Sequence, residues 1–160
     1  MSIITIGQTA PDFTIPNQDG APVTLSSLKG KYVVLYFYPK ANTPGCTTQA
    51  CSIRDEKSLF DGLNAVVLGV SPDPVKHVKK FVEKQELNFT LLADEDKTVV
   101  EAYGVWVEKS MYGRTYMGAE RTTFIIDPAG KVAAIFPKVK PAEHTKLVTD
   151  WIKSHSTAAA

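Results

Sequence analysis

Two long runs of apolar residues stand out in the hydropathy pattern of the chain. They are "KYVVLYFYP", from Lys31 to Pro39, and "AVVLGVS", from Ala65 to Ser71, and both are rich in β-branched and aromatic residues. Uninterrupted apolar runs of this length are typical of strands buried on both faces of a sheet. We therefore predict two buried strands, the first of them central.

Shorter apolar runs predict further strands. "TTFIID" at Thr122–Asp127 and "KVAAIF" at Lys131–Phe136 flank the turn sequence "PAG", a pattern that predicts a β-hairpin. Gly20 and Pro22 mark a turn in an irregular or hairpin-like amino-terminal segment.

The segments between these strands have helical periodicity. Asp73 is a candidate cap for a helix through Glu86, with Pro74 at its first position. A closing amphipathic helix is predicted over Glu143–His155, with one apolar stripe formed by Leu147, Val148, Trp151 and Ile152. This alternation predicts an α/β domain, a central mixed β-sheet flanked by helices. We expect residues 1–160 to form a single domain, with 156–160 as a frayed tail.

Composition narrows the function classes. With 18 basic and 17 acidic residues the chain carries a net charge of +1, so there is no electrostatic argument for nucleic acid or an anionic membrane. The longest strongly apolar stretch, Tyr32–Tyr38, is too short to cross a bilayer, and the amino terminus lacks the pattern of a secretory signal. We expect a cytoplasmic protein, in which two close cysteines favour redox or catalytic chemistry over a structural disulfide.

Both cysteines lie in "TPGCTTQAC", Thr43–Cys51. Thr43 fits a helix N-cap and Pro44 the first helical position, so a helix should begin here. At 100° per residue, Cys46 shares a face with the apolar residues Ala50, Ile53 and Phe60. We therefore expect Cys46 to lie in the first helical turn and to point toward the sheet.

Cys51 should lie on another face of the same helix. It is about 140° from Cys46, and helix geometry puts the two Cα atoms roughly 8.7 Å apart. A disulfide needs a Cα separation of about 4.4 to 6.8 Å. The two sulfurs can therefore pair only if the helix unwinds between them, which would make the pair a conformational switch.

The position of Cys46 also favours reactivity. Free backbone N–H groups and the positive end of the helix dipole stabilise a thiolate, which is the nucleophilic form of cysteine. A nearby guanidinium would add to this effect and could bind an oxygen leaving group. The chain has three arginines, Arg54, Arg114 and Arg121. We expect Arg121 to be the one near Cys46, because it precedes the strand "TTFIID" and strand ends approach neighbouring β-α loops.

Each of these residues also has a purely structural interpretation. Cys46 could be a small buried hydrophobic residue, and Cys51 an incidental helical cysteine. Thr43 could serve only as a cap, Pro39 only as a strand terminator, and Arg121 only in a surface ion pair. The histidines are interpreted as solvated surface residues on outer helices; they are His77, His144 and His155. Two cysteines without a nearby histidine do not supply a zinc site, and no phosphate-binding glycine loop is present.

Two motifs resemble a known family. "PKANTPGC" fits the peroxiredoxin signature Pro-x-x-x-Thr-x-x-Cys through Pro39, Thr43 and Cys46. The longer "FYPKANTPGCTTQACSIRD" and "RTTFIID" resemble the branch called bacterioferritin comigratory protein or peroxiredoxin Q. The similarity runs from "APDF" near Ala10 through the carboxy-terminal helix. Gln49 and Arg54 also match the family pattern, although both could be ordinary helix-surface residues.

The resemblance implies a thioredoxin-like fold and an antioxidant peroxidase that reduces hydrogen peroxide and organic hydroperoxides. Cys46 would be the peroxidatic cysteine and Arg121 the arginine that activates it. Thr43 would hydrogen-bond the peroxide, and Pro39 would shield the pocket. Cys51 would be the resolving cysteine, condensing with the Cys46 sulfenic acid into an intramolecular disulfide after local unwinding.

The resemblance also implies what the protein works with. Thioredoxin or a glutaredoxin-like dithiol would reduce the disulfide. No cofactor and no metal would be needed, and the chain would be a monomer, with a dimer as the alternative.

Two other functions compete with this interpretation. A thioredoxin-like disulfide reductase normally uses Cys-x-x-Cys, which is absent here, and it carries a cis-proline where this chain has Thr122. A redox sensor or holdase would use the Cys46–Cys51 disulfide to switch a binding surface, but no partner-binding motif is recognisable.

Overall fold

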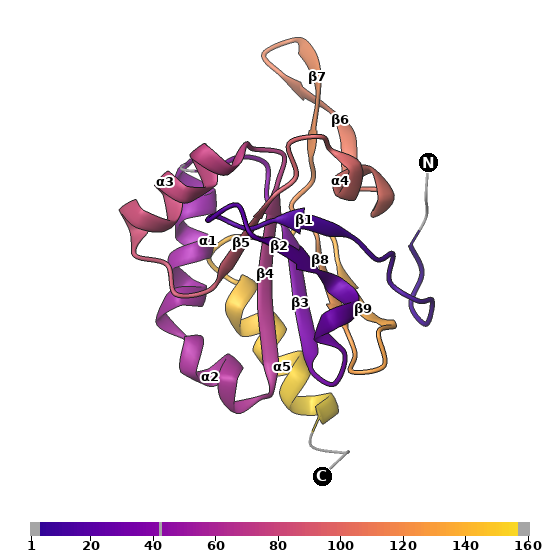
Figure 1. The fold of residues 1–160 in the computed structure, drawn as a ribbon. Helices are drawn as coiled ribbons and strands as arrows, with labels where there is room; N and C mark the ends of the chain where they lie inside the picture. The colour runs from indigo at the N-terminus through magenta and orange to yellow at the C-terminus, as the bar shows by residue number, and fades with distance from the viewer. Residues whose placement is uncertain (1–3, 42, 157–160) are drawn as a thin grey trace.

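A five-stranded mixed sheet forms the centre of the molecule (Figure 1). The computed structural model describes residues 4–41 and 43–156. Of the predicted frayed tail 156–160, Ser156 is the last residue of a helix and residues 157–160 lie outside the described residues. The strand order is β5-β4-β3-β8-β9. The first three of these strands are parallel to one another, and β8 and β9 are antiparallel to their neighbours. The strands are β3 (Tyr32–Phe37), β4 (Ala65–Ser71), β5 (Thr90–Ala93), β8 (Thr123–Ile126) and β9 (Val132–Phe136).

This sheet confirms the sequence prediction closely. The strand predicted as central, β3, lies in the middle of the five, β4 has the predicted bounds, and β8 and β9 form the predicted hairpin. The amino-terminal turn is also found, between β1 (Thr14–Pro16) and β2 (Pro22–Thr24). Strand β5 was not predicted, because a four-residue strand is too short for a clear periodic signal.

Helices cover the sheet. They are α1 (Pro44–Asp55), α2 (Lys57–Gly62), α3 (Val75–Gln85), α4 (Thr98–Ala102) and α5 (His144–Ser156), with a 3₁₀ turn η1 at Leu25–Leu28. The alternation of side chains along β3 separates two cores. Val34 and Tyr36 pack with residues of α1, α2, α3 and α5, whereas Val33 and Leu35 pack with α4 and the amino-terminal segment. The predicted mixed sheet flanked by helices is confirmed.

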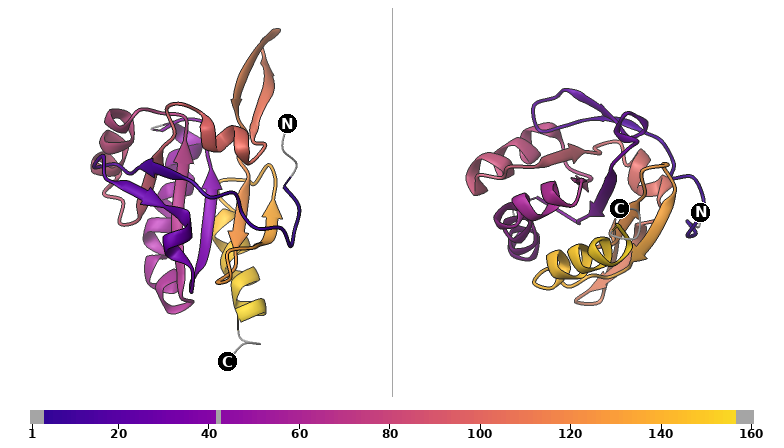
Figure 2. Two further views of the ribbon diagram at one scale, coloured as in Figure 1. Left: turned by 45° about the vertical axis from the view of Figure 1, so that its right-hand side comes forward. Right: turned by 90° about the horizontal axis from the view of Figure 1, so that it is seen from below.

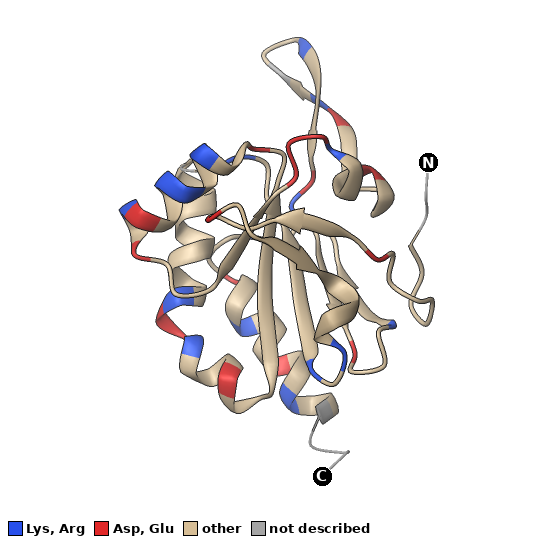
Figure 3. Ribbon diagram, in the orientation of Figure 1, with Lys and Arg blue, Asp and Glu red and all other residues tan. Residues whose placement is uncertain are grey.

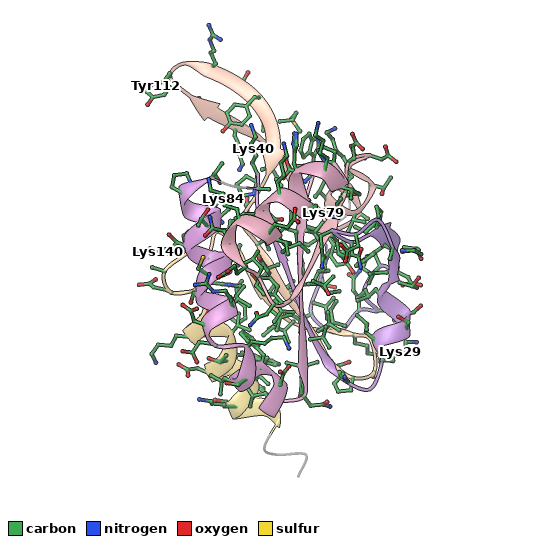
Figure 4. All side chains as sticks on the ribbon, turned by 60° about the vertical axis from the view of Figure 1, so that its left-hand side comes forward. Lys29, Lys40, Lys79, Lys84, Tyr112 and Lys140 are labelled. Atoms are coloured by element: carbon green, nitrogen blue, oxygen red, sulfur yellow. The ribbon has the colours of Figure 1, made fainter. Side chains whose placement is uncertain are left out.

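A hairpin of β6 (Trp106–Met111) and β7 (Arg114–Ala119) projects from the body of the molecule (Figure 2). Its two-residue turn has positive φ at both Tyr112 (53°) and Gly113 (77°), the backbone of a type I′ turn. Tyr112 is 97% exposed and points away from the body at the tip (Figure 4). The sequence pattern did not predict this hairpin, because most of its residues are polar or exposed and have no buried face to mark.

Two helix predictions need correction. Asp73 does not cap α3, whose N-cap is Pro74; its carboxylate is buried and bonds elsewhere, as described below. On α5, Val148 and Ile152 are fully buried, but Leu147 is 42% exposed and does not belong to the buried stripe. The buried face of α5 includes the polar residues Thr145 and Thr149 instead. One reason is that α5 contacts α1 through a hydrogen bond, from Ser52 to Thr145 at 2.8 Å.

Acidic and basic residues are interspersed along the ribbon of the described residues (Figure 3). The described part of the chain contains no helix that is both long and apolar enough to cross a bilayer.

Candidate active site

The loop between the central strand and α1 positions the first cysteine. Thr43 is the N-cap, with the expected extended backbone, and Pro44 is the first helical residue. The Thr43 carbonyl accepts from the backbone N–H of Thr47 at 2.8 Å, which starts the helix. The Thr43 hydroxyl does not cap the helix; it donates to the Lys40 carbonyl at 2.9 Å. The loop therefore closes on itself before the helix begins, and the Thr43 hydroxyl oxygen keeps lone pairs for a further donor.

Arg121 reaches the first cysteine. Cys46 is only 1% exposed, and Arg121 Nη2 donates to its Sγ at 3.3 Å. Arg121 Nη1 donates to Gln49 Oε1 at 2.6 Å. Gln49 lies one helical turn after Cys46 and is fully buried, with its Nε2 unpartnered. Within the described residues Arg121 forms no ion pair with a carboxylate.

Strand order explains why Arg121 is there. It precedes β8, which is the antiparallel neighbour of β3. The backbone N–H of Phe37 donates to the Thr122 carbonyl at 2.8 Å, so this end of β8 lies beside the end of β3 from which the loop to α1 departs. The Arg121 carbonyl accepts from the Val139 backbone N–H at 2.9 Å, which fixes it from the other side.

The guanidinium of Arg121 lies close to the first turn of α1. A Cβ placed on Gly45 would meet Arg121 Nη2 at 3.2 Å and Pro141 Cγ at 3.5 Å. A side chain at this position would need the guanidinium that contacts the sulfur to shift by a few tenths of an ångström, so the tight spot here is one of close approach and not of backbone conformation.

A buried carboxylate holds the loop from below. Asp73 Oδ2 accepts from the backbone N–H of Ala41 at 2.8 Å, a contact between residues 32 positions apart. Pro39 lies half-buried at the start of the same loop. The N-cap prediction for Asp73 was wrong because a tertiary partner, invisible in the local pattern, takes its carboxylate.

A buried histidine and tyrosine lie beneath the site. His144 is fully buried, its Nε2 is 2.7 Å from Thr123 Oγ1, and its ring is 5.4 Å from that of Tyr36. Burial, with a smaller contribution from the charge of Arg121, lowers the pKa of His144 to about 3, so the ring is neutral near neutral pH. The predicted surface location of His144 is therefore wrong, whereas His77 and His155 are exposed.

The ring of Tyr36 lies against Gly69, where a larger residue would leave no room for it. A Cβ on Gly69 of β4 would meet Tyr36 Cζ at 2.7 Å and its hydroxyl oxygen at 2.8 Å. The two residues face each other in the β3–β4 register. Burial raises the pKa of Tyr36 well above its usual value, and the charges of Tyr38 and Cys46 add to the effect. The phenol is therefore a protonated, buried part of the floor below α1.

The second cysteine has a different environment. Cys51 is half-buried, and its Sγ donates to Gln85 Oε1 at 3.5 Å, at the carboxyl end of α3. Both cysteines are free thiols. The predicted separation onto two faces of one helix is found, with Cys46 on the buried face together with Ala50 and Ile53.

A cavity of about 580 Å³ opens beside Arg121, between the base of the projecting hairpin and the segment before α5. Val107, Lys109, Tyr116 and Val139 contribute to its wall. The stem of Lys109 lies across Gly118, and its Nζ donates to the Ala119 carbonyl at 2.6 Å. Burial, followed by the charge of Arg121, lowers the pKa of Lys109. Lys109 could not be predicted from local pattern, because only the fold of the hairpin brings it to this cavity.

The structure thus brings Cys46 and Arg121 into contact and places Thr43 at the N-cap of the same helix. It also adds Gln49, for which a surface position was an open alternative in the sequence analysis. Arg114 lies away from them, on the projecting hairpin. Over residues 4–41 and 43–156 no cluster of three potential His, Cys, Asp or Glu ligands for a metal ion occurs.

Comparison with known proteins agrees with this geometry. The family model described as AhpC/TSA matches residues 6–135. The chain belongs to the AhpC/TSA family. It is 50% identical over 154 residues to a protein of Haemophilus influenzae named putative peroxiredoxin bcp, covering 96% of this chain and 99% of that one. Peroxiredoxin Bcp of Escherichia coli is 46% identical over 156 residues, 98% of this chain and 100% of its own.

Solved structures place this AhpC/TSA protein in the same branch. The Xanthomonas campestris bacterioferritin comigratory protein, whose structures are described as insights into alkyl peroxide reduction, has a TM-score of 0.88 at 36% identity, covering 95% of this chain and 99% of its own. The PrxQ of Xylella fastidiosa has a TM-score of 0.92 at 35% identity, covering 98% and 99%. The predicted thioredoxin-like fold and the resemblance to the bacterioferritin comigratory protein and peroxiredoxin Q branch are confirmed.

Proposed function

We propose that this protein is a thiol-dependent peroxidase in which Cys46 reduces hydrogen peroxide and organic hydroperoxides and Cys51 resolves the product. The coarser part, a peroxidase of the peroxiredoxin type, is supported by family membership and by near-full-length relatives that carry this name. The observation that carries the finer part is the 3.3 Å contact between Arg121 Nη2 and the sulfur of Cys46, at the start of a helix.

In the first step the Cys46 thiolate attacks one oxygen of the peroxide. An S–O bond forms, the O–O bond breaks, and the departing oxygen takes a proton to leave as water or alcohol. Arg121, as a fixed cation, stabilises both the thiolate and the negative charge that develops on the departing oxygen. We assign Thr43 to hydrogen bonding of the peroxide and Pro39 to shielding of the pocket.

In the second step Cys51 attacks the Cys46 sulfenic acid. The two residues lie on different faces of α1, so at least one turn of the helix must unwind before the sulfurs meet. An external dithiol such as thioredoxin or a glutaredoxin-like protein then reduces the disulfide and restores both thiols. The neutral, buried His144 has no role as a base in this scheme, since it contacts Thr123 and not a thiol.

Thiol counting during a peroxide titration tests the proposal. Reduced protein is mixed with one equivalent of hydrogen peroxide in a stopped-flow instrument, with tryptophan fluorescence as the signal and mass spectrometry of quenched samples. We expect both thiols to disappear per peroxide, with a mass loss of two hydrogens. Cys46→Ser should not react, and Cys51→Ser should consume one peroxide and stop at the sulfenic acid.

Two results would contradict the proposal. Peroxide consumption by Cys46→Ser at the wild-type rate would remove Cys46 from the first step. A wild-type reaction as slow as that of a free thiol, or thiols that never pair, would favour the redox-sensor interpretation.

A further inference from the structure

Gln85, the last residue of α3, makes two hydrogen bonds to the second half of α1. Gln85 accepts twice: its side-chain Oε1 from the Cys51 thiol at 3.5 Å, and its backbone carbonyl from Arg54 Nη1 at 2.6 Å. Asn88, three residues further along, donates from Nδ2 to the Arg54 carbonyl at 3.2 Å. The part of α1 that carries Cys51 is therefore attached to a segment that does not contain the peroxidatic site.

Arg54 lies beside the Cys51 thiol. The two residues are three positions apart on a helix and so share one face, and both make hydrogen bonds to Gln85. Arg54 Nε donates to Asp55 Oδ1 at 3.0 Å. The hydrogen bond to Asp55 raises the pKa of Arg54, partial burial opposes this, and the charge of Cys51 adds to the increase.

We infer that Arg54 is a positioning residue for the resolving step: held on the Gln85 carbonyl, its guanidinium keeps a positive charge beside Cys51 and favours the thiolate that attacks Cys46. The inference deepens the proposed function and rests on it. A fixed cation near a thiol is a recognised means of increasing its thiolate fraction.

The chemistry of the step needs that thiolate. The Cys51 sulfur attacks the sulfur of the Cys46 sulfenic acid, the S–S bond forms, and the S–O bond breaks. Hydroxide leaves and takes up a proton to become water, so the oxidised sulfur of Cys46 and the thiol of Cys51 end as one disulfide. No further oxidant is required.

The attachments also suggest which half of α1 moves. Once Cys46 is a neutral sulfenic acid, its charge attraction to Arg121 is lost, whereas Gln85, Asn88 and the Ser52–Thr145 contact still hold the second half. The first turn of the helix should therefore unwind toward a Cys51 that stays in place beside Arg54.

Other charged or titratable groups surround this position and must be considered in any pH experiment. From α1 itself these are Arg54 and Asp55, and from the residue after α3 it is Glu86, whose charge also acts on Arg54. From β3, Tyr36 faces the helix, and its own pKa is too high for it to titrate near neutrality. The Tyr36 phenol therefore adds no ionisation of its own to a rate profile between pH 6 and 9.

The test measures the rate of disulfide formation after a single peroxide turnover, from pH 6 to 9, separately from the peroxide-dependent first phase. The variants are Arg54→Met, which removes the charge, and Arg54→Lys, which keeps it. Lys84→Met is the matched control, since Lys84 is an exposed cation in the last turn of α3 (Figure 4). Thiol loss is followed by mass spectrometry.

We expect Arg54→Met to slow disulfide formation about fivefold at pH 7, the scale of an exposed charge effect, with a deficit that shrinks as the pH rises and the thiol ionises unaided. Arg54→Lys should recover most of the rate, and Lys84→Met should match the wild type. The peroxide-dependent phase should be the same in all four proteins.

The outcomes separate the inference from the proposed function. If Arg54→Met matches the wild type at every pH, or is slower by one constant factor, Arg54 has no charge role and the inference is wrong while the disulfide cycle stands. If the wild type itself never forms the Cys46–Cys51 disulfide, the proposed function fails first.

Discussion

The two cysteines of α1 lie in contrasting environments only five residues apart. Cys46 is 1% exposed and contacts Arg121, which comes from the edge of a strand 75 positions away in sequence. Cys51 is half-buried and contacts Gln85 at the end of a neighbouring helix. The first environment is built from the ends of central strands, whereas the second is built from the end of a helix. One helix therefore carries a buried thiol beside a cation and, on another face, a second thiol held by Gln85.

The largest effect on the difference between the two cysteines is expected when the cation beside Cys46 is removed. Arg121→Met should slow the peroxide-dependent phase about 100-fold, because loss of one charged donor to a reacting group typically costs two to three orders of magnitude. The rate of the later disulfide phase should change much less. Stopped-flow fluorescence at several peroxide concentrations separates the two phases.

Arg121→Lys is the informative companion to that variant. It keeps the charge but loses the planar fork that bridges Cys46 and Gln49, so its rate should lie between those of Arg121→Met and the wild type. Equal first-phase rates in all three proteins would remove Arg121 from the site.

Acid should lower the free energy of unfolding through His144, which is buried near the Cys46 environment. His144 has a folded pKa of about 3 against an unfolded value near 6.5, so the unfolded chain binds more protons between these limits. Its contribution to stability is fully present above about pH 6.5 and falls as the pH drops toward 3, by up to about 1.4 kcal/mol per pH unit. Urea unfolding from pH 7 to 4 measures this slope, and His144→Gln should flatten it. An unchanged slope in that variant would show that His144 charges freely in the folded protein.

Substitutions of Gln49 test whether its side chain orients Arg121 beside Cys46. Gln49→Met removes the acceptor that orients Arg121 and should slow the first phase about tenfold, the scale of one hydrogen bond to a charged group. The unfolding free energy should change little, because the substitution also removes an unpartnered buried N–H group. Gln49→Glu keeps an acceptor but places a carboxylate on the Arg121 guanidinium, which offsets its charge, so its first-phase rate should also fall below that of the wild type. A wild-type rate in Gln49→Met would show that the Gln49 acceptor does not orient Arg121.

The smallest effect on the first-phase rate is expected from Ser52, in the half of α1 that carries Cys51. Ser52 donates to Thr145 at 2.8 Å and ties the Cys51 half of α1 to α5. Ser52→Ala should lower the unfolding free energy by about 1 kcal/mol and change the first phase very little. Thermal unfolding and the first-phase rate check both statements, with the exposed Ser58→Ala on α2 as the control. A slower first phase would mean that this bond supports the Cys46 environment after all.

The sequence predicted the parts of the molecule that depend on local patterns. The β3 and β4 runs, the start of α1 at Pro44 and the placement of Cys46 toward the sheet all follow from residues close together in the chain. The expectation that Arg121 approaches Cys46 came from strand-end topology and from a family motif, and the structure brings the two together.

The rest could not be predicted, because it depends on distant partners. Asp73 looked like a helix cap until Ala41 supplied a backbone donor from another loop. His144 looked like a surface residue until Thr123 and Tyr36 enclosed it. Lys109 could not be predicted, since only the turn at Tyr112 and Gly113 folds β7 back along β6 and supplies the Ala119 carbonyl that accepts from its Nζ. Each failure concerns a polar group whose partner lies at least 20 residues away or depends on an exposed hairpin.

The glycine under Tyr36 has a consequence for how this site tolerates change. Gly69 carries no reactive group and lies on β4, one strand removed from the loop that leads to Cys46. Yet a Cβ there would lie 2.6 Å from Leu91 Cδ2 and 2.7 Å from Tyr36 Cζ, so both buried side chains would have to move. Random mutagenesis scored on peroxide resistance should therefore find this position among the least permissive, alongside residues that touch the substrate. The tolerance of the region around Cys46 to substitution therefore depends in part on the absence of a side chain at Gly69 of the neighbouring strand β4.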